Sequence, residues 1–382
     1  MIQSKINRHI RSMGRTLLGV GPMSTNCIDS AIELADQNEI PILLIASRRQ
    51  IDSKEFGGGY VNNWTTQQFA DYVRAKSQTG NAILARDHGG PWQNNLEKER
   101  NLSLPEAMAS AKLSYTRDIE AGMQVLHIDP SLDINGQPST REVLDRIFEL
   151  YGFCWETARS MNREVLFEVG TEEQTGGTND VNDLDFVISS INAFCESIGA
   201  PKPSFTVVQC GTRVMEARNV GSLGGYDPDK GQEVNDELRS MIGVCNRHGV
   251  FLKEHNTDYL ADDALRMHPI VGIHSANVAP EFGVTETRAF IQLLEQRSLH
   301  PLIERFLRLS YDSRKWEKWM LHDTCASDRD RSIIAGHYVF STPEFLQIKE
   351  ESSHHIKDVD MHLKTAVKSS IYRYLSHFGG II

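Results

Sequence analysis

Residues Ile40–Ser47 read IPILLIAS, a nearly continuous apolar run that precedes a polar segment and then the amphipathic stretch Thr65–Thr79. Such a run is typical of a strand buried on both faces, as in a parallel sheet covered by helices. Seven further apolar runs alternate with amphipathic stretches in the same way: Thr16–Met23, Asn81–Asp87, Met123–Asp129, Glu164–Gly170, Phe205–Cys210, Val250–His255 and Pro269–His274. The sequence therefore indicates an α/β protein built from repeated strand–helix units.

Eight such units within roughly 285 residues suit a closed (β/α)8 barrel, also called a TIM barrel. The alternative is an open doubly wound sheet, which needs a glycine-rich phosphate turn after its first strand. That turn reads GPMSTN here and contains no GxGxxG motif, so the barrel is favoured. The pattern changes near residue 300. We predict a barrel over 1–299 that carries the active site, and a helical C-terminal appendage over 300–382 that packs on it.

The composition excludes several classes of protein. The chain has 382 residues, with 40 Lys and Arg against 51 Asp and Glu, which gives a net charge of −11. An acidic surface repels phosphate backbones, so we expect no binding to nucleic acid or to anionic membranes. No apolar run is long enough to span a bilayer, and the six cysteines are scattered without a CxxC pair. These features are typical of a cytoplasmic protein.

Ionisable residues follow the predicted strands at the points where each strand ends. Asp87 and His88 follow the third strand, Asp129 the fourth, Glu168 the fifth and His255 the seventh. The carboxyl ends of the strands of a TIM barrel surround the active site. Burying so many charged groups costs several kcal/mol each unless a metal or a substrate compensates them. We therefore expect these side chains to meet at the mouth of the barrel.

A metal site is the chemistry that this set of residues favours. His88, Glu168, His255 and His274 offer nitrogen and oxygen ligands from four different strands. Ligands of this kind hold Zn²⁺ with an open position for substrate, and they also suit Mn²⁺ or Co²⁺.

Proton transfer is the second chemistry that we expect at the mouth. Asp87 lies beside His88 and should point in a different direction along the strand, so it is the candidate to transfer protons. Glu172, or its neighbour Glu173, is a second candidate on the glycine-rich loop after the fifth strand.

Other polar residues at the strand ends are candidates for substrate contacts. Lys253 is expected to bind a substrate oxyanion or phosphate, and a Schiff-base role is disfavoured because Glu254 and Asp258 keep its amine charged. Arg48 or Arg49 could bind an anionic group, although an ordinary salt bridge fits Arg48 or Arg49 about as well. The predicted substrate-binding set is Ser47, Arg48, Gln50, Asp129, Asn256, Asp258, Ser275 and Asn277.

Five motifs in the same order make the chain resemble a known family. They are Leu44–Ala70 (LIASRRQIDSKEFGGGYVNNWTTQQFA), Arg86–Gln93 (RDHGGPWQ), His127–Ser131 (HIDPS), Gly170–Gly177 (GTEEQTGG) and Lys253–Leu260 (KEHNTDYL). These motifs are similar to those of the non-catalytic subunit family of class II D-tagatose-1,6-bisphosphate aldolase, which was formerly called tagatose-6-phosphate kinase. The wider group is that of the class II ketose-bisphosphate aldolases.

The resemblance implies a zinc-dependent barrel in which Asp87 donates a proton, His88 and His255 bind zinc, and Glu168 matches a glutamate of the family. Two departures, NTDY after His255 and HSAN at 274–277, replace the phosphate-binding segments of the wider group. The arginines of SRRQ at 47–50 add positive charge, which suggests a different anionic substrate.

Two functions are consistent with the sequence. The first is a metal-dependent sugar aldolase, or an epimerase that breaks and remakes a carbon–carbon bond, acting on a ketose phosphate or a related anionic sugar. The second is a non-catalytic subunit that stabilises a partner aldolase and has no working metal site. We also expect a homo-oligomer.

Overall fold

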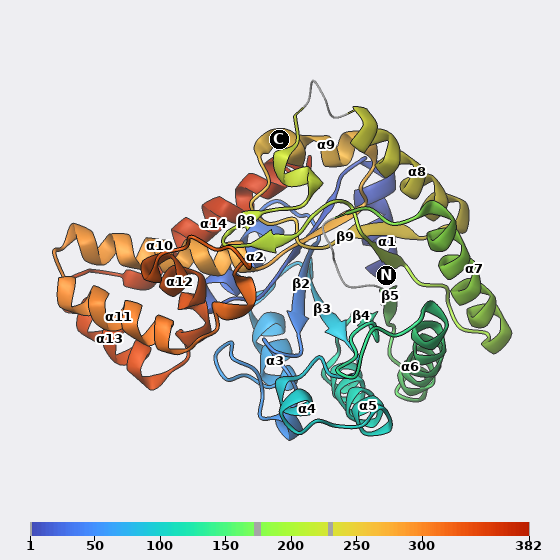
Figure 1. The fold of residues 1–382 in the computed structure, drawn as a ribbon, viewed down its shortest axis with the longest axis horizontal. Coiled ribbons are helices and arrows are strands. Elements are labelled where there is room, and N and C mark those ends of the chain that lie inside the picture. The colour runs from blue at the N-terminus through green and yellow to red at the C-terminus, as the bar shows by residue number, and fades with distance from the viewer. Residues whose placement is uncertain (1, 172–176, 228–231, 382) are drawn as a thin grey trace.

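Eight parallel strands close into a barrel in the computed structural model, which describes residues 2–171, 177–227 and 232–381 (Figure 1). The strands follow one another around the barrel in chain order, and the last pairs with the first. They are β1 (Leu17–Val20), β2 (Ile42–Ser47), β3 (Ala82–Gly89), β4 (Val125–Ile128), β5 (Leu166–Val169), β6 (Phe205–Val208), β9 (Phe251–Glu254) and β10 (Ser275–Val278). The prediction of a TIM barrel is confirmed.

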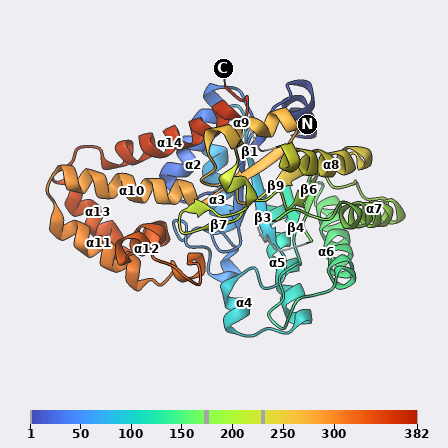
Figure 2. The same cartoon turned by 45° about the horizontal axis from the view of Figure 1, so that its top comes forward.

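Amphipathic helices cover the outside of the barrel and bury their apolar faces against it (Figures 1 and 2). Three of them begin with a capping box, in which Thr65, Ser103 and Ser139 satisfy free backbone N–H groups. The helices are α2 (Thr25–Gln37), α3 (Thr66–Lys76), α4 (Asn95–Glu99), α5 (Leu104–Ala121), α6 (Thr140–Ser160), α7 (Val181–Ile198), α8 (Gln232–His248), α9 (Asp262–Val271) and α10 (Pro280–Gln296). A small hairpin of β7 (Val214–Met215) and β8 (Arg218–Asn219) lies between β6 and α8.

The predicted position of the eighth strand is wrong. Pro269 lies inside α9, Gly272 ends that helix with a left-handed φ of 96°, and the strand β10 begins only at Ser275. The apolar run at 269–273 is thus mostly the buried end of a helix, which periodicity cannot distinguish from a short strand. The true strand reads SANV, and its polar residues hid it from a search for apolar runs.

The N-terminal segment closes the end of the barrel at which the strands begin. Helix α1 (Ile2–Asn7) and a following π-helical turn, η1 (Arg8–Ser12), place Ile6 and Ile10 in the apolar cluster that fills the barrel. The guanidinium of Arg11 lies 4.9 Å from the centre of the Phe251 ring. Because the N-terminal end is filled, the carboxyl ends of the strands form the open mouth.

The remaining helices form a second layer beside the barrel, orange to red at the left of Figure 1. They are α11 (His300–Asp312), α12 (Asp328–Ala335), α13 (Pro343–Ser353) and α14 (Val359–His377), with short 3-10 turns at Glu317–Trp319 and Gly336–Val339. We call residues 300–381 the C-terminal region. Its apolar cluster also includes Phe290 of α10. Among the described residues, no helix has the length and apolarity that crossing a membrane requires.

Candidate metal centre

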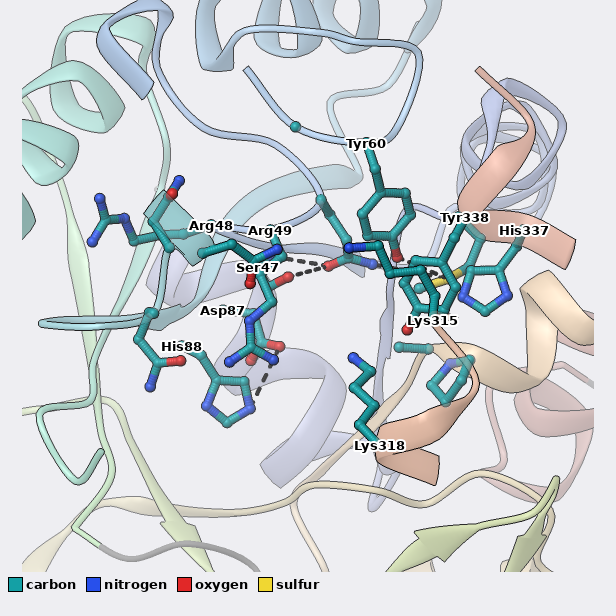
Figure 3. A pocket seen from close by; sticks show the side chains of 18 of the residues that line it. Ser47, Arg48, Arg49, Tyr60, Asp87, His88, Lys315, Lys318, His337 and Tyr338 are labelled. Atoms are coloured by element: carbon teal, nitrogen blue, oxygen red, sulfur yellow. Dashed lines mark hydrogen bonds and ion pairs between the residues drawn. The ribbon is translucent and has the colours of Figure 1, made fainter. Parts of the chain in front are cut away.

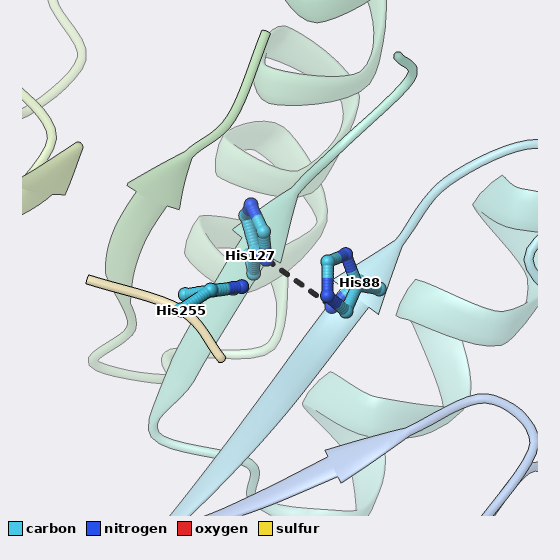
Figure 4. A group of neighbouring side chains, drawn as sticks. All are labelled: His88, His127 and His255. Carbon is cyan, nitrogen blue, oxygen red and sulfur yellow. Dashed lines mark hydrogen bonds between the residues drawn. The ribbon is translucent and has the colours of Figure 1, made fainter. Parts of the chain in front are cut away.

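Three histidines meet at the mouth of the barrel (Figure 4). His88 belongs to β3, His127 to β4, and His255 directly follows β9. The ring centres of His88 and His255 are 5.0 Å apart, and each lies 5.3 Å from the ring centre of His127. Each ring offers a nitrogen within 4.8 Å of a nitrogen on the other two. A single cation can therefore be reached by all three side chains.

A bulge in β3 brings Asp87 and His88 to the same cavity. The pairing of β3 with β4 shifts between Arg86 and Gly89, and His88 has a left-handed φ of 44°. Asp87 keeps the regular inward direction, while the bulge turns His88 inward as well, so that Oδ2 of Asp87 lies 3.9 Å from Nε2 of His88. The expectation that the two side chains point in different directions is wrong for this reason.

His127 is a cluster member that was absent from the predicted ligand set. In the run MQVLHID it alternates with Val125 and Asp129, so all three face the barrel interior, a signal that was present in the sequence. Its Nε2 is buried and has no hydrogen-bond partner among the described residues. Gly170 provides the room for this ring, because a Cβ atom there would lie 2.5 Å from Nε2.

Glu168 and Lys253 form a buried ion pair that adjoins the histidines. Nζ of Lys253 donates to Oε2 of Glu168 at 2.5 Å, and Nε2 of His255 lies 3.1 Å from Oε1 of the same carboxylate. Burial alone would raise the pKa of Glu168, but Lys253 and the two neighbouring histidines lower it to about 2. Lys253 is 1% exposed and does not line the cavities described below, so the structure does not bring it to a substrate.

Asp129 holds His88 in place and sets its charge. Oδ2 of Asp129 lies 2.6 Å from Nδ1 of His88. Burial opposes protonation of His88, but Asp87 and Asp129 outweigh it and raise the pKa of His88 to about 9. The pKa of Asp87 is lowered although burial alone would raise it, since His88, His255 and His127 surround the carboxylate. In the metal-free protein, Asp87 is therefore ionised and His88 carries the opposite charge.

The cluster has the donor chemistry of a divalent metal site. Two overlapping groups of side chains have ligand atoms within 4.8 Å of one another: the three histidines, and Asp87 and Glu168 together with His127 and His255. Three imidazoles with carboxylates nearby suit Zn²⁺. Nδ1 of His127 lies 3.8 Å from Oδ1 of Asp87 and 3.6 Å from Oε1 of Glu168, and Nε2 of His255 lies 3.8 Å from the same Asp87 oxygen, so these donor atoms face one another.

Two cavities open above the cluster. The larger, of about 740 Å³, reaches Asp87 and His88 from the loop after β2 and is walled by the C-terminal region (Figure 3). The smaller, of about 390 Å³, lies over β4 to β6 and is also lined by His88, His127 and Asp129. Arg49, His88, Gln93, Asn256, Lys318 and Trp319 line both. The volume of the larger cavity is in the usual range for a small-molecule site.

Several predicted substrate residues lie at these cavities. Ser47 and Gln50 line the larger one and are hydrogen-bonded to each other, Oγ to Oε1, at 2.9 Å. Asn256 lines both cavities, and Asn277 lies beside the cluster, where its amide donates to Oδ1 of Asp87 at 3.3 Å. Among the described residues, Arg48 has its guanidinium in ion pairs with Asp52 and Glu97, so Arg49 is the arginine available to a ligand.

Other predicted residues are placed elsewhere. His274 precedes β10 at the closed end of the barrel, where its Nδ1 accepts the N–H of Leu252, so it cannot be a metal ligand of this cluster. Ser275 donates to the carbonyl of Leu17 within the barrel wall. Asp258 accepts the N–H groups of Ala279 and Glu281 at the start of α10. Glu172 and Glu173 lie outside the described residues.

Comparisons with known proteins agree with this architecture. A family model for D-tagatose-1,6-bisphosphate aldolase subunit GatZ/KbaZ-like proteins matches residues 2–277. A probable tagatose 6 phosphate kinase from Sinorhizobium meliloti 1021 is 20% identical, with a TM-score of 0.73 over 95% of this chain and 100% of that one.

Two more distant structures share the fold. One is a fructose-bisphosphate aldolase from Campylobacter jejuni, 11% identical, with a TM-score of 0.57 over 99% of this chain and 94% of that one. The other is the fructuronate-tagaturonate epimerase UxaE from Cohnella laeviribosi, 12% identical, with a TM-score of 0.57 over 96% of this chain and 81% of that one. The family match covers well over half of the sequence, and the chain therefore belongs to the GatZ/KbaZ-like family of D-tagatose-1,6-bisphosphate aldolase subunits.

Proposed function

We propose that this protein is a metal-dependent carbohydrate aldolase, or a retro-aldol-type epimerase, that acts on a ketose phosphate or a related anionic sugar. The observation that supports this most strongly is the group of three histidines beside an ionised carboxylate, Asp87. Asp87 and His88 of this group line the 740 Å³ cavity, and His127 lines the smaller one. Its position at the carboxyl ends of the barrel strands is where TIM barrel enzymes carry their chemistry.

His88, His127 and His255 are the proposed metal ligands, with His127 in the place that His274 was expected to take. Nδ1 of His88 is held by Asp129, which leaves Nε2 for the metal, as is usual for histidines that bind metals. Glu168 contacts Nε2 of His255, the nitrogen that faces the cluster, and so lies beside the proposed metal position. A divalent cation bound there, most suitably Zn²⁺, would polarise a sugar carbonyl and stabilise negative charge on its oxygen. Lys253 acts through Glu168 and is a positioning residue.

Asp87 is the proposed proton-transfer group. Its ionised carboxylate takes the proton from the hydroxyl group that is β to the carbonyl. The electron pair of the broken carbon–carbon bond then moves toward the carbonyl group, and the hydroxyl carbon becomes an aldehyde. Return of the proton from Asp87 to the hydroxyl oxygen when the bond re-forms on the other face gives an epimer. Aldol cleavage results when the carbon that kept the electron pair instead takes a proton, for which Glu172 is the proposed donor, and the two fragments leave. Asn277 orients Asp87, and Glu172 is proposed as the second proton carrier.

A second candidate function is that of a non-catalytic subunit that stabilises a partner aldolase. The family description, which names an aldolase subunit, favours it. This function requires neither a bound metal nor a proton-transfer group. The two proposals therefore differ in a property that can be measured on the purified chain.

The test is the metal content of protein that is purified without added metal. The variants are His88→Ala, His127→Ala and His255→Ala. The matched control is His274→Asn, which changes a partly buried histidine at the closed end of the barrel and keeps an acceptor for the N–H of Leu252. We expect about one equivalent of metal in the parent and in the control, and loss of at least 10-fold in affinity in the three cluster variants.

Metal binding would be followed by screening ketose phosphates and sugar acids for cleavage and epimerisation, with Asp87→Asn as the inactive variant that still binds metal. A parent that contains no metal and takes none up on titration rules out the proposed chemistry. The subunit function would then be tested by adding the chain to a class II aldolase and measuring the thermal stability of that partner.

A further inference from the structure

The wall of the larger cavity is built from two distant parts of the chain. One side comes from the loop after β2, with Arg49 and Tyr60, and the other comes from the C-terminal region, with Lys315, Lys318 and Tyr338 (Figure 3). Asn62 and Ser341 hold the two sides together, because the N–H of Asn62 donates to Oγ of Ser341 at 2.7 Å. The C-terminal region is thus part of the cavity and not only a support for the barrel.

Three cations face this cavity without a carboxylate partner. The side chains of Arg49, Lys315 and Lys318 extend into the same space in Figure 3, and none forms an ion pair with a described residue. Other lysines of the C-terminal region behave differently, since Lys349 and Lys364 each lie within 3 Å of a carboxylate oxygen. The three cations thus line one cavity of a chain whose net charge is −11, and no described carboxylate neutralises them.

The carboxylates that line this cavity, Asp87 and Glu317, already have partners. Glu317 accepts a hydrogen bond from Nε of Arg314 at 2.6 Å, and Asp87 lies at the cluster among the histidines. Lys318 is held by aromatic rings, with Nζ 4.6 Å from the ring centre of Trp319 and 5.3 Å from that of Tyr338. These contacts fix the direction of Lys318 and leave its charge without a counter-ion among the described residues.

The neighbouring His337 is kept neutral. Burial, and to a smaller degree the charge of Lys318, lower the pKa of His337 to about 3. Its ring packs between Tyr60 and Tyr338, with ring centres 6.2 and 4.1 Å away. Apart from His88 at the cluster, the cations that line the cavity and have no carboxylate partner among the described residues are therefore Arg49, Lys315 and Lys318.

We propose that Arg49, Lys315 and Lys318 bind the anionic terminal group, a phosphate or a carboxylate, of a sugar whose reacting carbons lie at Asp87 and His88. This inference rests on the function proposed above and names its substrate class. Both ends belong to one cavity, and its volume of about 740 Å³ has room for a phosphorylated six-carbon sugar in its open form. The lysines come from the C-terminal region, so that region determines specificity.

The test uses ligands that cannot react, because they have no carbonyl group. Metal-depleted protein is titrated in a calorimeter with D-glucitol 6-phosphate, with D-gluconate and with neutral D-glucitol. The variants are Lys318→Met, Lys315→Met and Arg49→Met. The control is Lys357→Met, which removes an exposed lysine of the C-terminal region that lines neither cavity.

We expect at least one of the two anionic ligands to bind and neutral glucitol to bind at least 10-fold more weakly. Each cavity variant should weaken the anion by about 10-fold, which corresponds to about 1.4 kcal/mol, and Lys357→Met should bind like the parent. Tighter binding of the phosphate or of gluconate identifies the terminal group. Equal binding of charged and neutral ligands, no binding of either anion, or variants that bind like the parent would overturn the inference.

The outcome is independent of the metal chemistry. Metal content is measured separately in Lys318→Met, which should retain the parent's value. Loss of anion binding with metal retained leaves the proposed enzyme function in place, whereas anion binding by a chain that takes up no metal supports the subsite and removes the proposed chemistry.

Discussion

His274 lies at the closed end of the barrel, opposite the three histidines of the cluster at the mouth. Burial, assisted by the charge of Arg11, lowers the pKa of His274 to about 4, so the ring is neutral in the folded protein. A histidine in the unfolded chain binds a proton near pH 6.5. The contribution of His274 to stability is therefore complete above about pH 6.5 and is lost as the pH falls toward 4, because the unfolded state takes up the proton first.

The variant His274→Asn removes this titration and keeps an oxygen for the N–H of Leu252. We expect its free energy of unfolding, measured with urea, to fall less steeply than that of the parent between pH 6.5 and 4. The difference should reach at most about 3 kcal/mol at the acid end. Equal slopes for both proteins would show that His274 is not protected from protons by folding.

At the scale of the element, the end of β5 shapes the site without supplying a ligand. Gly170 lies directly after the strand, and any side chain there would press on Nε2 of His127. We expect Gly170→Ala to turn the His127 ring and to lower metal affinity by about 10- to 100-fold, although every donor remains. The measurement is a competition titration with a chromogenic chelator.

The matched control is Gly152→Ala in the helix α6, where a new Cβ would meet no atom closer than 3.6 Å. A methyl group in a helix interior should leave metal affinity unchanged and slightly favour folding. Metal binding by Gly170→Ala at the strength of the parent would mean that His127 is not a ligand.

The elements also show what the sequence could predict. Seven of the eight strands are apolar runs, and their alternation with helices was enough to predict the barrel. The strand β10 was displaced, because SANV is polar and follows the apolar end of α9. Because the eighth strand was expected to end at His274, this residue was predicted to lie at the mouth of the barrel, whereas it lies at the closed end. His127 is absent from the predicted ligand set although strand alternation places it beside Asp129, and the bulge that turns His88 inward has no sequence signal of its own.

At the scale of the whole molecule, α14 joins two apolar clusters. Leu363 belongs to the cluster of the C-terminal region, while Val367, Ile371 and Leu375 belong to that of the barrel. Since one helix contributes to both, we expect the barrel and the C-terminal region to unfold in a single calorimetric transition. Leu363→Ala should lower the free energy of unfolding by about 2–5 kcal/mol and keep the transition single.

Two separate transitions, with only the first moved by Leu363→Ala, would show that the two clusters are independent. A matched control is Met361→Ala, because Met361 is 53% exposed on the same helix and its truncation should cost far less. The expected difference between the two variants comes from the cavity that the loss of a buried side chain leaves behind.

Sequence patterns do not predict that the C-terminal region lines the cavity. Both Arg48 and Arg49 follow a strand, so the sequence offers either of them as the residue that binds an anionic group. Lys315 and Lys318 follow none of the predicted strands and lie more than 260 residues away from Arg49 in sequence. The contacts of Ser341 with Asn62 and of Tyr60 with His337 and Tyr338 show that these segments share one cavity.

The closed end of the barrel has a consequence for synthesis on the ribosome. Helix α1 and β1 precede Phe251 and β10, on which they also pack, by more than 230 residues of the chain. At about 5–20 residues per second, the early segment waits on the order of tens of seconds with its apolar side uncovered. The barrel can therefore close only after β10, which ends at Val278 of the 382 residues, has been made, and until then the apolar residues of α1 lack part of their cover.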